Sequence, residues 1–418
     1  MFKRYKLDNG IRVVCEKIPY MHSVSLGIWI GTGSRNENIS NNGISHFIEH
    51  MLFKGTESKS AKEIAETIDN IGGQLNAFTG KECTCFYAKT LDAHINISLE
   101  LLSDMFFNSR FDKKDIDVEN KVILEEIGMY EDSPEELVHD LLSETIWAGD
   151  SLGYPILGTE ESLRNINRQT IQEYLRQNYT PENTVISVAG NYEDDKLAEL
   201  IEQYFSGWNL QVKSKKPYKT PEFVVNSRIR EKDTEQVHIC LGFNGIEQGN
   251  DELYALLAVN NILGGGMSSR LFQKIREEKG LAYSIYSYPS SYKDAGQFTI
   301  YAGMNPEHLE KVIALIYKEI DGLRKNGIGK EDLEKSKEQL KGSYILGLES
   351  TSSRMNSIGK SELLLGVIYT PEEILQKIDN ITMEDIHRAI ASTFNMEKVS
   401  FSAVGRLNKD IDFIKLFN

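Results

Sequence analysis

The chain has 418 residues, of which 40% are hydrophobic and 26% charged, and its formal net charge is −15. This length predicts a globular protein of two domains of about 200 residues each. The acidic charge argues against nucleic acid and anionic membranes as partners, and no apolar run is long enough to span a bilayer.

Hydrophobic periodicity predicts the elements in chain order. Alternating, strand-like patterns cover residues 10–16, 23–31, 74–79, 83–88 and 184–190. Helical spacing covers residues 43–56, 60–71, 91–107 and 113–131, resumes beyond Pro134 and returns at 169–178. Ser60 is the expected cap of the second helix, which ends at Gly72. The mixture predicts an α+β fold.

The most informative stretch is Gly43–Thr56, which contains His46, Glu49 and His50. If it is helical, the two histidines stand four residues apart on one face, with Glu49 on the flank of that face. Two imidazoles beside a carboxylate in an apolar setting suit a divalent metal such as Zn²⁺, and this order of residues is the inverse of the common zinc-protease pattern. The alternative is a helix with two core histidines and a solvated glutamate.

Two histidines need at least one further protein ligand. On the helix predicted at 113–131, Glu119 and Glu126 are seven residues apart and lie on nearly the same face, whereas Glu125 is rotated away by about 100°. We therefore expect Glu126 as the third ligand and Glu119 as a second carboxylate behind it. The alternative is a solvated, charged helix face without a metal.

The second half of the chain repeats features of the first. Residues 86–88 are echoed at 300–302, 214 positions later, and residues 188–190 are echoed at 403–405, 215 positions later. A nearly constant offset indicates a duplicated structural unit. The segment 259–266, which corresponds to the histidine motif, contains neither His nor Glu, so we expect a metal site in the first half only.

We therefore predict two homologous α+β domains, each an antiparallel sheet packed with helices. The first spans residues 1–214 and carries the metal motif, and the second spans residues 222–418. The polar run 213–217 is the expected linker.

The chain resembles the pitrilysin-type zinc peptidases, the family that includes the mitochondrial processing peptidases and insulin-degrading enzyme. It is most similar to the short bacterial members. The resemblance runs the whole length and is carried by Leu7–Gly10, Gly33–Glu37, His46–Thr56, Asn76–Thr79, Val122–Ile127, Tyr179–Asn183 and, in the second half, Leu271–Tyr283.

This resemblance implies a metal centre and a mechanism. His46, His50 and Glu126 would hold one Zn²⁺ per chain, because the family's third ligand falls about 76 positions after the second histidine. Glu119 matches the carboxylate that the family places behind the ligands. Glu49 would take a proton from the zinc-bound water, whose pKa falls from 15.7 toward ~7, and pass it to the leaving amine.

The resemblance also implies a clam shell of two domains around a chamber that admits unfolded or short peptides. A peptide would add as a strand beside Asn76, Ala77 and Phe78. Arg276 and Tyr283 of the second domain would reach the substrate and stabilise the oxyanion of the transition state. Apart from the resemblance, these two residues read equally well as a salt-bridged surface arginine and a core tyrosine.

We therefore expect a zinc metalloendopeptidase. The alternative is a non-catalytic peptide-binding or scaffold subunit that partners an active homologue, although such members usually lack part of the His-Glu-His set. By resemblance, the chain forms a homodimer or a heterodimer with an inactive homologue. We expect it in the cytoplasm, because its four cysteines are too few for a disulfide framework and no secretory signal follows the basic N-terminus.

Overall fold

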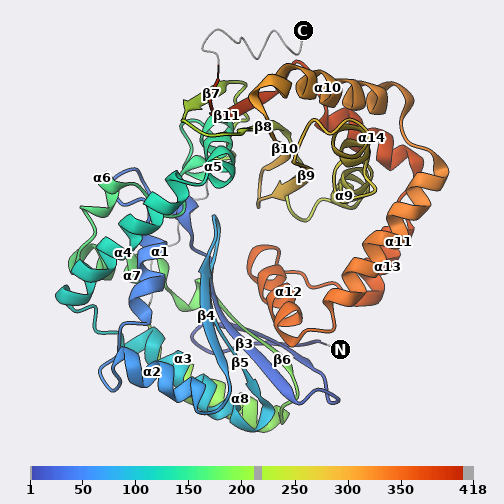
Figure 1. The fold of residues 1–418 in the computed structure, drawn as a ribbon. Helices are drawn as coiled ribbons and strands as arrows, with labels where there is room; N and C mark the ends of the chain where they lie inside the picture. Colours follow the sequence, from blue (N-terminus) through green and yellow to red (C-terminus); the bar gives the residue numbers. More distant parts are fainter. Residues whose placement is uncertain (1, 211–218, 408–418) are drawn as a thin grey trace. The chain divides into compact units, whose positions relative to one another are not determined.

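The structure, a computed structural model, describes residues 2–210 and 219–407. The chain forms two compact units, each built on one β-sheet with covering helices (Figure 1). Within the described residues, unit 1 comprises 2–127, 154–210 and 346–368, and unit 2 comprises 128–153, 219–345 and 369–407. The linker predicted at 213–217 lies outside the described residues.

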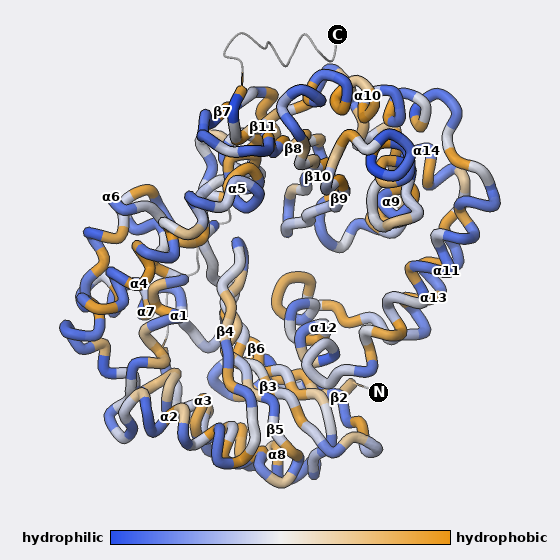
Figure 2. The backbone as a smooth tube through the Cα atoms, viewed as in Figure 1, coloured by the Kyte–Doolittle hydropathy of each residue, from blue (hydrophilic) through white to orange (hydrophobic). Residues whose placement is uncertain are grey.

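The sheet of unit 1 has six strands in the described residues, and its two central strands are the most buried. The strand order is β1 (Phe2–Lys6), β2 (Arg12–Lys17), β6 (Thr184–Gly190), β3 (Ser23–Ile30), β5 (Thr84–Leu91) and β4 (Gln74–Thr79). Only β2 and β6 pair in parallel; the other neighbours are antiparallel. Figure 2 shows hydrophobic stretches along β3 and β6, which are covered on both faces. At the edge, β4 alternates between exposed and half-buried residues, as a strand with one solvated face does.

Helices cover both faces of this sheet. They are α1 (Ile44–Leu52), α2 (Ala61–Asp69), α3 (Ile95–Asn108), α4 (Lys113–Glu131), α6 (Glu160–Leu163), α7 (Arg168–Asn178), α8 (Asp194–Phe205) and α12 (Thr351–Leu364). Ser60 caps α2 as predicted and forms a capping box with Glu63. The helix predicted at 91–107 begins only at Ile95, because β5 continues to Leu91 and a short 3₁₀ turn follows it.

One helix of unit 1 comes from the second half of the sequence. The helix α12 packs on β2, β3 and β6, where Met355 and Ile358 join a core cluster with Trp29. Ion pairs hold the helix near both ends, Arg354 with Glu16 and Glu362 with Arg4. The domains predicted from the sequence, 1–214 and 222–418, would place α12 in the second domain, whereas the helix belongs to unit 1.

Unit 2 repeats the same plan. Its strand order is β7 (Ser227–Glu231), β11 (Ser400–Gly405), β8 (Val237–Asn244), β10 (Gly296–Met304) and β9 (Ser284–Ser291), with β7 and β11 parallel. Its helices are α5 (Pro134–Ile146), α9 (Glu252–Leu263), α10 (Leu309–Asn326), α11 (Lys330–Gly347), α13 (Pro371–Asp379), α14 (Met383–Thr393) and a π-helix, η5 (Phe272–Glu277). The helix α5, from the first half of the sequence, packs on β8 and β11.

The predicted α+β class and the predicted repeat are confirmed. Residues 86–88 lie in β5 and residues 300–302 in β10, which hold equivalent places in the two sheets, and the same holds for 188–190 in β6 and 403–405 in β11. The enclosure of a chamber stays a prediction. No helix in the described ranges is long and apolar enough to cross a membrane.

Candidate metal centre

The helix α1 brings the two histidines together. It begins after Gly43, whose φ of +91° is a left-handed conformation that favours glycine, and a Cβ there would lie 2.6 Å from the Leu157 carbonyl oxygen. The apolar side chains of α1, such as Phe47 and Ile48, are fully buried, and His46 is only 8% exposed. The predicted helix with basic side chains in an apolar setting is therefore confirmed.

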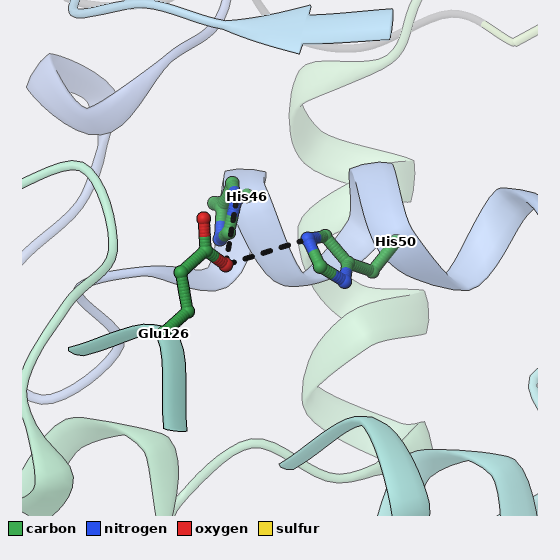
Figure 3. A group of neighbouring side chains, drawn as sticks. All are labelled: His46, His50 and Glu126. Atoms are coloured by element: carbon green, nitrogen blue, oxygen red, sulfur yellow. Dashed lines mark ion pairs between the residues drawn. The ribbon is translucent and has the colours of Figure 1, made fainter. Parts of the chain in front are cut away.

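Three donor atoms converge at this helix. The Nε2 atoms of His46 and His50 each lie 3.8 Å from Oε2 of Glu126, which comes from α4 (Figure 3). One ligand atom from each of the three residues lies within 4.8 Å of the others. The structure thus brings together the three residues that the sequence analysis selected as metal ligands.

This donor set fits a zinc ion. Ligand atoms about 2.0–2.1 Å from a tetrahedral zinc are about 3.3 Å from one another, so a separation of 3.8 Å needs only a small contraction. Burial, reinforced by the neighbouring His50, lowers the pKa of His46 to about 4, so its imidazole is neutral at pH 7 and its lone pair is available. Two histidines and one carboxylate leave a coordination position open, as catalytic zinc sites do.

A second carboxylate supports the ligands from behind. Glu119 of α4 is 1% exposed, and its Oε2 lies 3.0 Å from Nδ1 of His50. Its other oxygen, Oε1, lies 2.6 Å from Nζ of Lys54. The imidazole of His50 therefore donates through Nδ1 to Glu119 and presents Nε2 toward Glu126, an arrangement that orients a histidine on a metal.

Glu49 lies on α1 between the two histidines and is half-buried. Its Oε2 accepts a hydrogen bond of 2.5 Å from Oγ1 of Thr79 in β4. Burial raises the pKa of Glu49, and the bond from Thr79 opposes this shift by favouring the charged carboxylate. A half-buried carboxylate with a raised pKa beside the candidate metal centre suits a general base.

The residues predicted to bind a peptide lie in the edge strand of unit 1. Asn76, Ala77 and Phe78 belong to β4, which pairs only with β5 in the described part of the sheet. The Asn76 side chain accepts a hydrogen bond from the Ala77 amide, and Phe78 packs edge-on against Trp29 with ring centroids 5.5 Å apart. Their contact with a peptide stays a prediction.

Arg276 and Tyr283 belong to unit 2. Tyr283 is 73% exposed, so its interpretation as a core tyrosine is wrong. The Arg276 guanidinium, on the π-helix η5, lies 4.7 Å from the ring centroid of Phe272 and 5.7 Å from that of Tyr283. Both side chains are exposed, and their approach to the metal centre stays a prediction.

Three residues that lie around the site, Lys54, Thr79 and Glu37, had no predicted part in the metal centre. Lys54 could have been found, because it follows His50 by four residues and so falls near the same side of the helix end. Thr79 could have been placed by strand alternation, since it shares a face with Ala77. Glu37 gave no local signal, yet its carboxylate accepts bonds from the backbone amides of Gly43 and Ser45 at the start of α1.

Comparison with known proteins gives matches along most of the chain. A family profile described as "Insulinase (Peptidase family M16)" matches residues 12–160, and one described as "Peptidase M16 inactive domain" matches residues 165–340. The uncharacterized zinc protease YmxG of Bacillus subtilis is 51% identical over 387 residues, covering 93% of this chain and 94% of that protein. An uncharacterized zinc protease of Streptomyces coelicolor is 38% identical over 412 residues, covering 97% of this chain and 90% of that protein.

Solved structures share the fold at lower sequence identity. A crystal structure of a protease from Helicobacter pylori superimposes with a TM-score of 0.89 at 24% identity, covering 97% of this chain and 99% of that one. A crystal structure of a peptidase M16 inactive domain from Pseudomonas fluorescens superimposes with a TM-score of 0.91 at 19% identity, covering 98% of each chain.

Proposed function

Because this chain belongs to peptidase family M16, we propose that it is a zinc metalloendopeptidase that hydrolyses unfolded or short peptides. The observation that carries the proposal is the convergence of His46, His50 and Glu126, with the Nε2 atoms of both histidines 3.8 Å from one carboxylate oxygen. Its relatives in Bacillus and Streptomyces are named zinc proteases.

In this proposal each residue of the site has one task. His46, His50 and Glu126 would hold one zinc ion per chain, which would act as a Lewis acid toward the scissile carbonyl and lower the pKa of water toward ~7. Glu49 takes the proton of the attacking water and delivers it to the leaving amine. Glu119 holds the imidazole of His50 in the tautomer that presents Nε2 as a ligand.

We further propose that the peptide adds as a strand to the free edge of β4 at Asn76, Ala77 and Phe78. Main-chain hydrogen bonds then supply affinity with little demand on sequence, which suits unfolded substrates. Arg276 and Tyr283 are the candidates for contact with the substrate and its oxyanion, because both side chains are exposed and carry a cationic group and a hydroxyl.

The test is the Glu49→Gln variant. We expect it to bind as much zinc as the wild type and to lose cleavage of a peptide library read by mass spectrometry, since only the proton-accepting oxygen is removed. Glu125→Gln is a matched control, because Glu125 is an exposed neighbour of Glu126 on α4. Equal cleavage by Glu49→Gln and wild type would remove the role given to Glu49.

A non-catalytic peptide-binding or scaffold role is the second candidate. The segment 165–340 matches a profile named for an inactive domain, and the second half lacks the metal motif. Zinc content per chain, together with peptide turnover in the presence and absence of a chelator, separates the two functions. A silent, zinc-free protein that still retains peptides would support the second one.

We also propose that the protein acts in the cytoplasm as a homodimer or as a heterodimer with an inactive homologue. All four cysteines are unpaired and buried, which fits a reducing compartment. Light scattering of the purified chain, alone and with a co-expressed homologue, measures the assembly.

A further inference from the structure

The end of strand β4 contacts helix α1, which carries Glu49. Exposure alternates along β4, so Ala77 and Thr79 share the less exposed face of the strand. This strand packs against α1, and Oγ1 of Thr79 donates its hydrogen bond to Oε2 of Glu49 over 2.5 Å. Among the described residues, no donor bonds the other carboxylate oxygen of Glu49.

The turn after Thr79 is held by the loop that precedes α1. Backbone amides of Ser34 and Arg35 donate to the carbonyl oxygens of Gly80 and Lys81, at 3.2 and 2.8 Å. The buried guanidinium of Arg35 pairs with Glu82 in the same turn at 2.6 Å. The approach is so close that a Cβ at residue 33 would lie 2.1 Å from the Gly80 carbonyl oxygen, which explains the glycine there.

The same loop also fixes the helix. Glu37 accepts hydrogen bonds from the backbone amides of Gly43 (2.7 Å) and Ser45 (2.8 Å) and from Nδ2 of Asn42 (2.8 Å). These amides are among the unpaired donors at the start of α1, and an acceptor there anchors the helix end. One loop, Gly33–Glu37, therefore anchors both partners of the bond between Thr79 and Glu49.

From this geometry we infer that Thr79 is a positioning residue for Glu49. Its hydroxyl occupies one carboxylate oxygen and leaves the other to face the water that attacks the peptide. A general base must lie within about 2.6–3.2 Å of the atom that carries the proton it removes, so a side chain free to rotate works less well. Because Thr79 ends the strand proposed to pair with the peptide, one rigid element aligns substrate and base. This inference rests on the proposed peptidase function.

Two variants separate the hydroxyl from the shape of the side chain, because Val keeps the shape of Thr without its hydroxyl and Ser keeps the hydroxyl without the methyl group. Thr79→Val removes the hydroxyl and keeps the volume, and we expect kcat to fall by about 10–100-fold with KM within about twofold. Thr79→Ser keeps the hydroxyl, and we expect kcat within about threefold of the wild type. Zinc content and Tm should be unchanged in both. Thr67→Val, which removes a hydroxyl that donates to a backbone carbonyl of α2, is the control.

Crystal structures of the two variants supply a readout that does not depend on turnover. We expect the Glu49 carboxylate to keep its place in Thr79→Ser and to turn away in Thr79→Val. Wild-type kcat in Thr79→Val, or an equal loss in both variants, would overturn the role of Thr79 while Glu49→Gln still defined a peptidase. A wild-type protein that cleaves no peptide would instead overturn the proposed function, and this inference with it.

Discussion

Replacing Lys54 by methionine tests the support of the metal site without touching a ligand. Glu119 is 1% exposed and is held between Nδ1 of His50 (3.0 Å) and Nζ of Lys54 (2.6 Å). Methionine keeps the length of the apolar stem and removes the ammonium group. Glu119 then remains buried with one partner fewer, and it holds the imidazole of His50 less firmly in the tautomer that presents Nε2 to the metal.

The expected magnitude follows from the position of each group. Changes to groups that orient metal ligands cost 10–100-fold in metal affinity, which corresponds to about 1.4–2.7 kcal/mol. The Lys54 side chain is 36% exposed, so water replaces part of its interaction and the loss should lie near tenfold. Glu119→Gln keeps an acceptor for His50 but removes the buried charge, and its loss should lie nearer 100-fold.

The assay is the zinc dissociation constant, measured by competition with a chromogenic chelator. In the Glu119→Gln background, Lys54→Met should add little, because the charge that Lys54 compensates is already gone. Lys62→Met is the control, since Lys62 is 82% exposed and, within the described part of the chain, pairs with Glu66 of its own helix alone. Wild-type zinc affinity in Lys54→Met would refute the reasoning. An equal loss of zinc affinity from Lys54→Met in the wild-type and Glu119→Gln backgrounds would refute it as well.

Three further predictions concern stability. Removing zinc with a chelator should lower the free energy of unfolding by about 2.7 kcal/mol relative to protein in zinc at 100 times its dissociation constant, as read from denaturant titrations; equal midpoints would mean that no zinc is bound. In unit 2, burial and, to a smaller extent, the charge of His238 lower the pKa of His139 to about 4. The side chains around His139 are Glu135, His238, Cys240, Tyr286 and Tyr288. This pKa is below that of a histidine in the unfolded chain, so the unfolded chain binds a proton first as pH falls. The free energy of unfolding should therefore fall by up to about 3 kcal/mol between pH 6.5 and 4. Parallel curves of unfolding free energy against pH for wild type and His139→Gln would contradict this. Gly359→Ala in α12 should destabilise by about 1–3 kcal/mol, because its Cβ would lie 2.3 Å from Nε1 of Trp29, whereas Gly342→Ala in α11 meets nothing within 4 Å and should be neutral or stabilising in thermal unfolding.

Local periodicity was enough to predict much of the metal site. His46 and His50 are one helical turn apart, and Glu119 and Glu126 are two turns apart, so each pair could be assigned to one face from spacing alone. The meeting of the two helices could not be worked out in this way, and the residue-by-residue resemblance to a known family supplied it. The structure then brought the predicted atoms together.

Contacts between segments far apart in sequence escaped prediction. The exchange of α5 and α12 between the two units was missed, because an amphipathic helix shows that it covers an apolar face but not which sheet it covers. The bonds of Lys54 to Glu119 and of Thr79 to Glu49 join residues 65 and 30 positions apart, and nothing in either local pattern names the partner. The role of Glu37 as an acceptor for α1 was missed for the same reason.

Units 1 and 2 share a contact between the edge strand and the neighbouring helix, but the residues that make this contact differ in charge. In unit 2 the edge strand β9 also bonds to the neighbouring helix, where Ser287 donates to Oδ1 of Asn260 at 2.8 Å, much as Thr79 donates to Glu49 in unit 1. The second contact is neutral and lies in an apolar core that includes Val259, so it is stable without an ion. In unit 1 the corresponding volume holds two imidazoles and several carboxylates, which are costly to bury unless a cation binds them. The shared fold therefore supplies the connection between strand and helix, and the charged residues of α1 and α4 suit that connection to the hydrolysis proposed for unit 1.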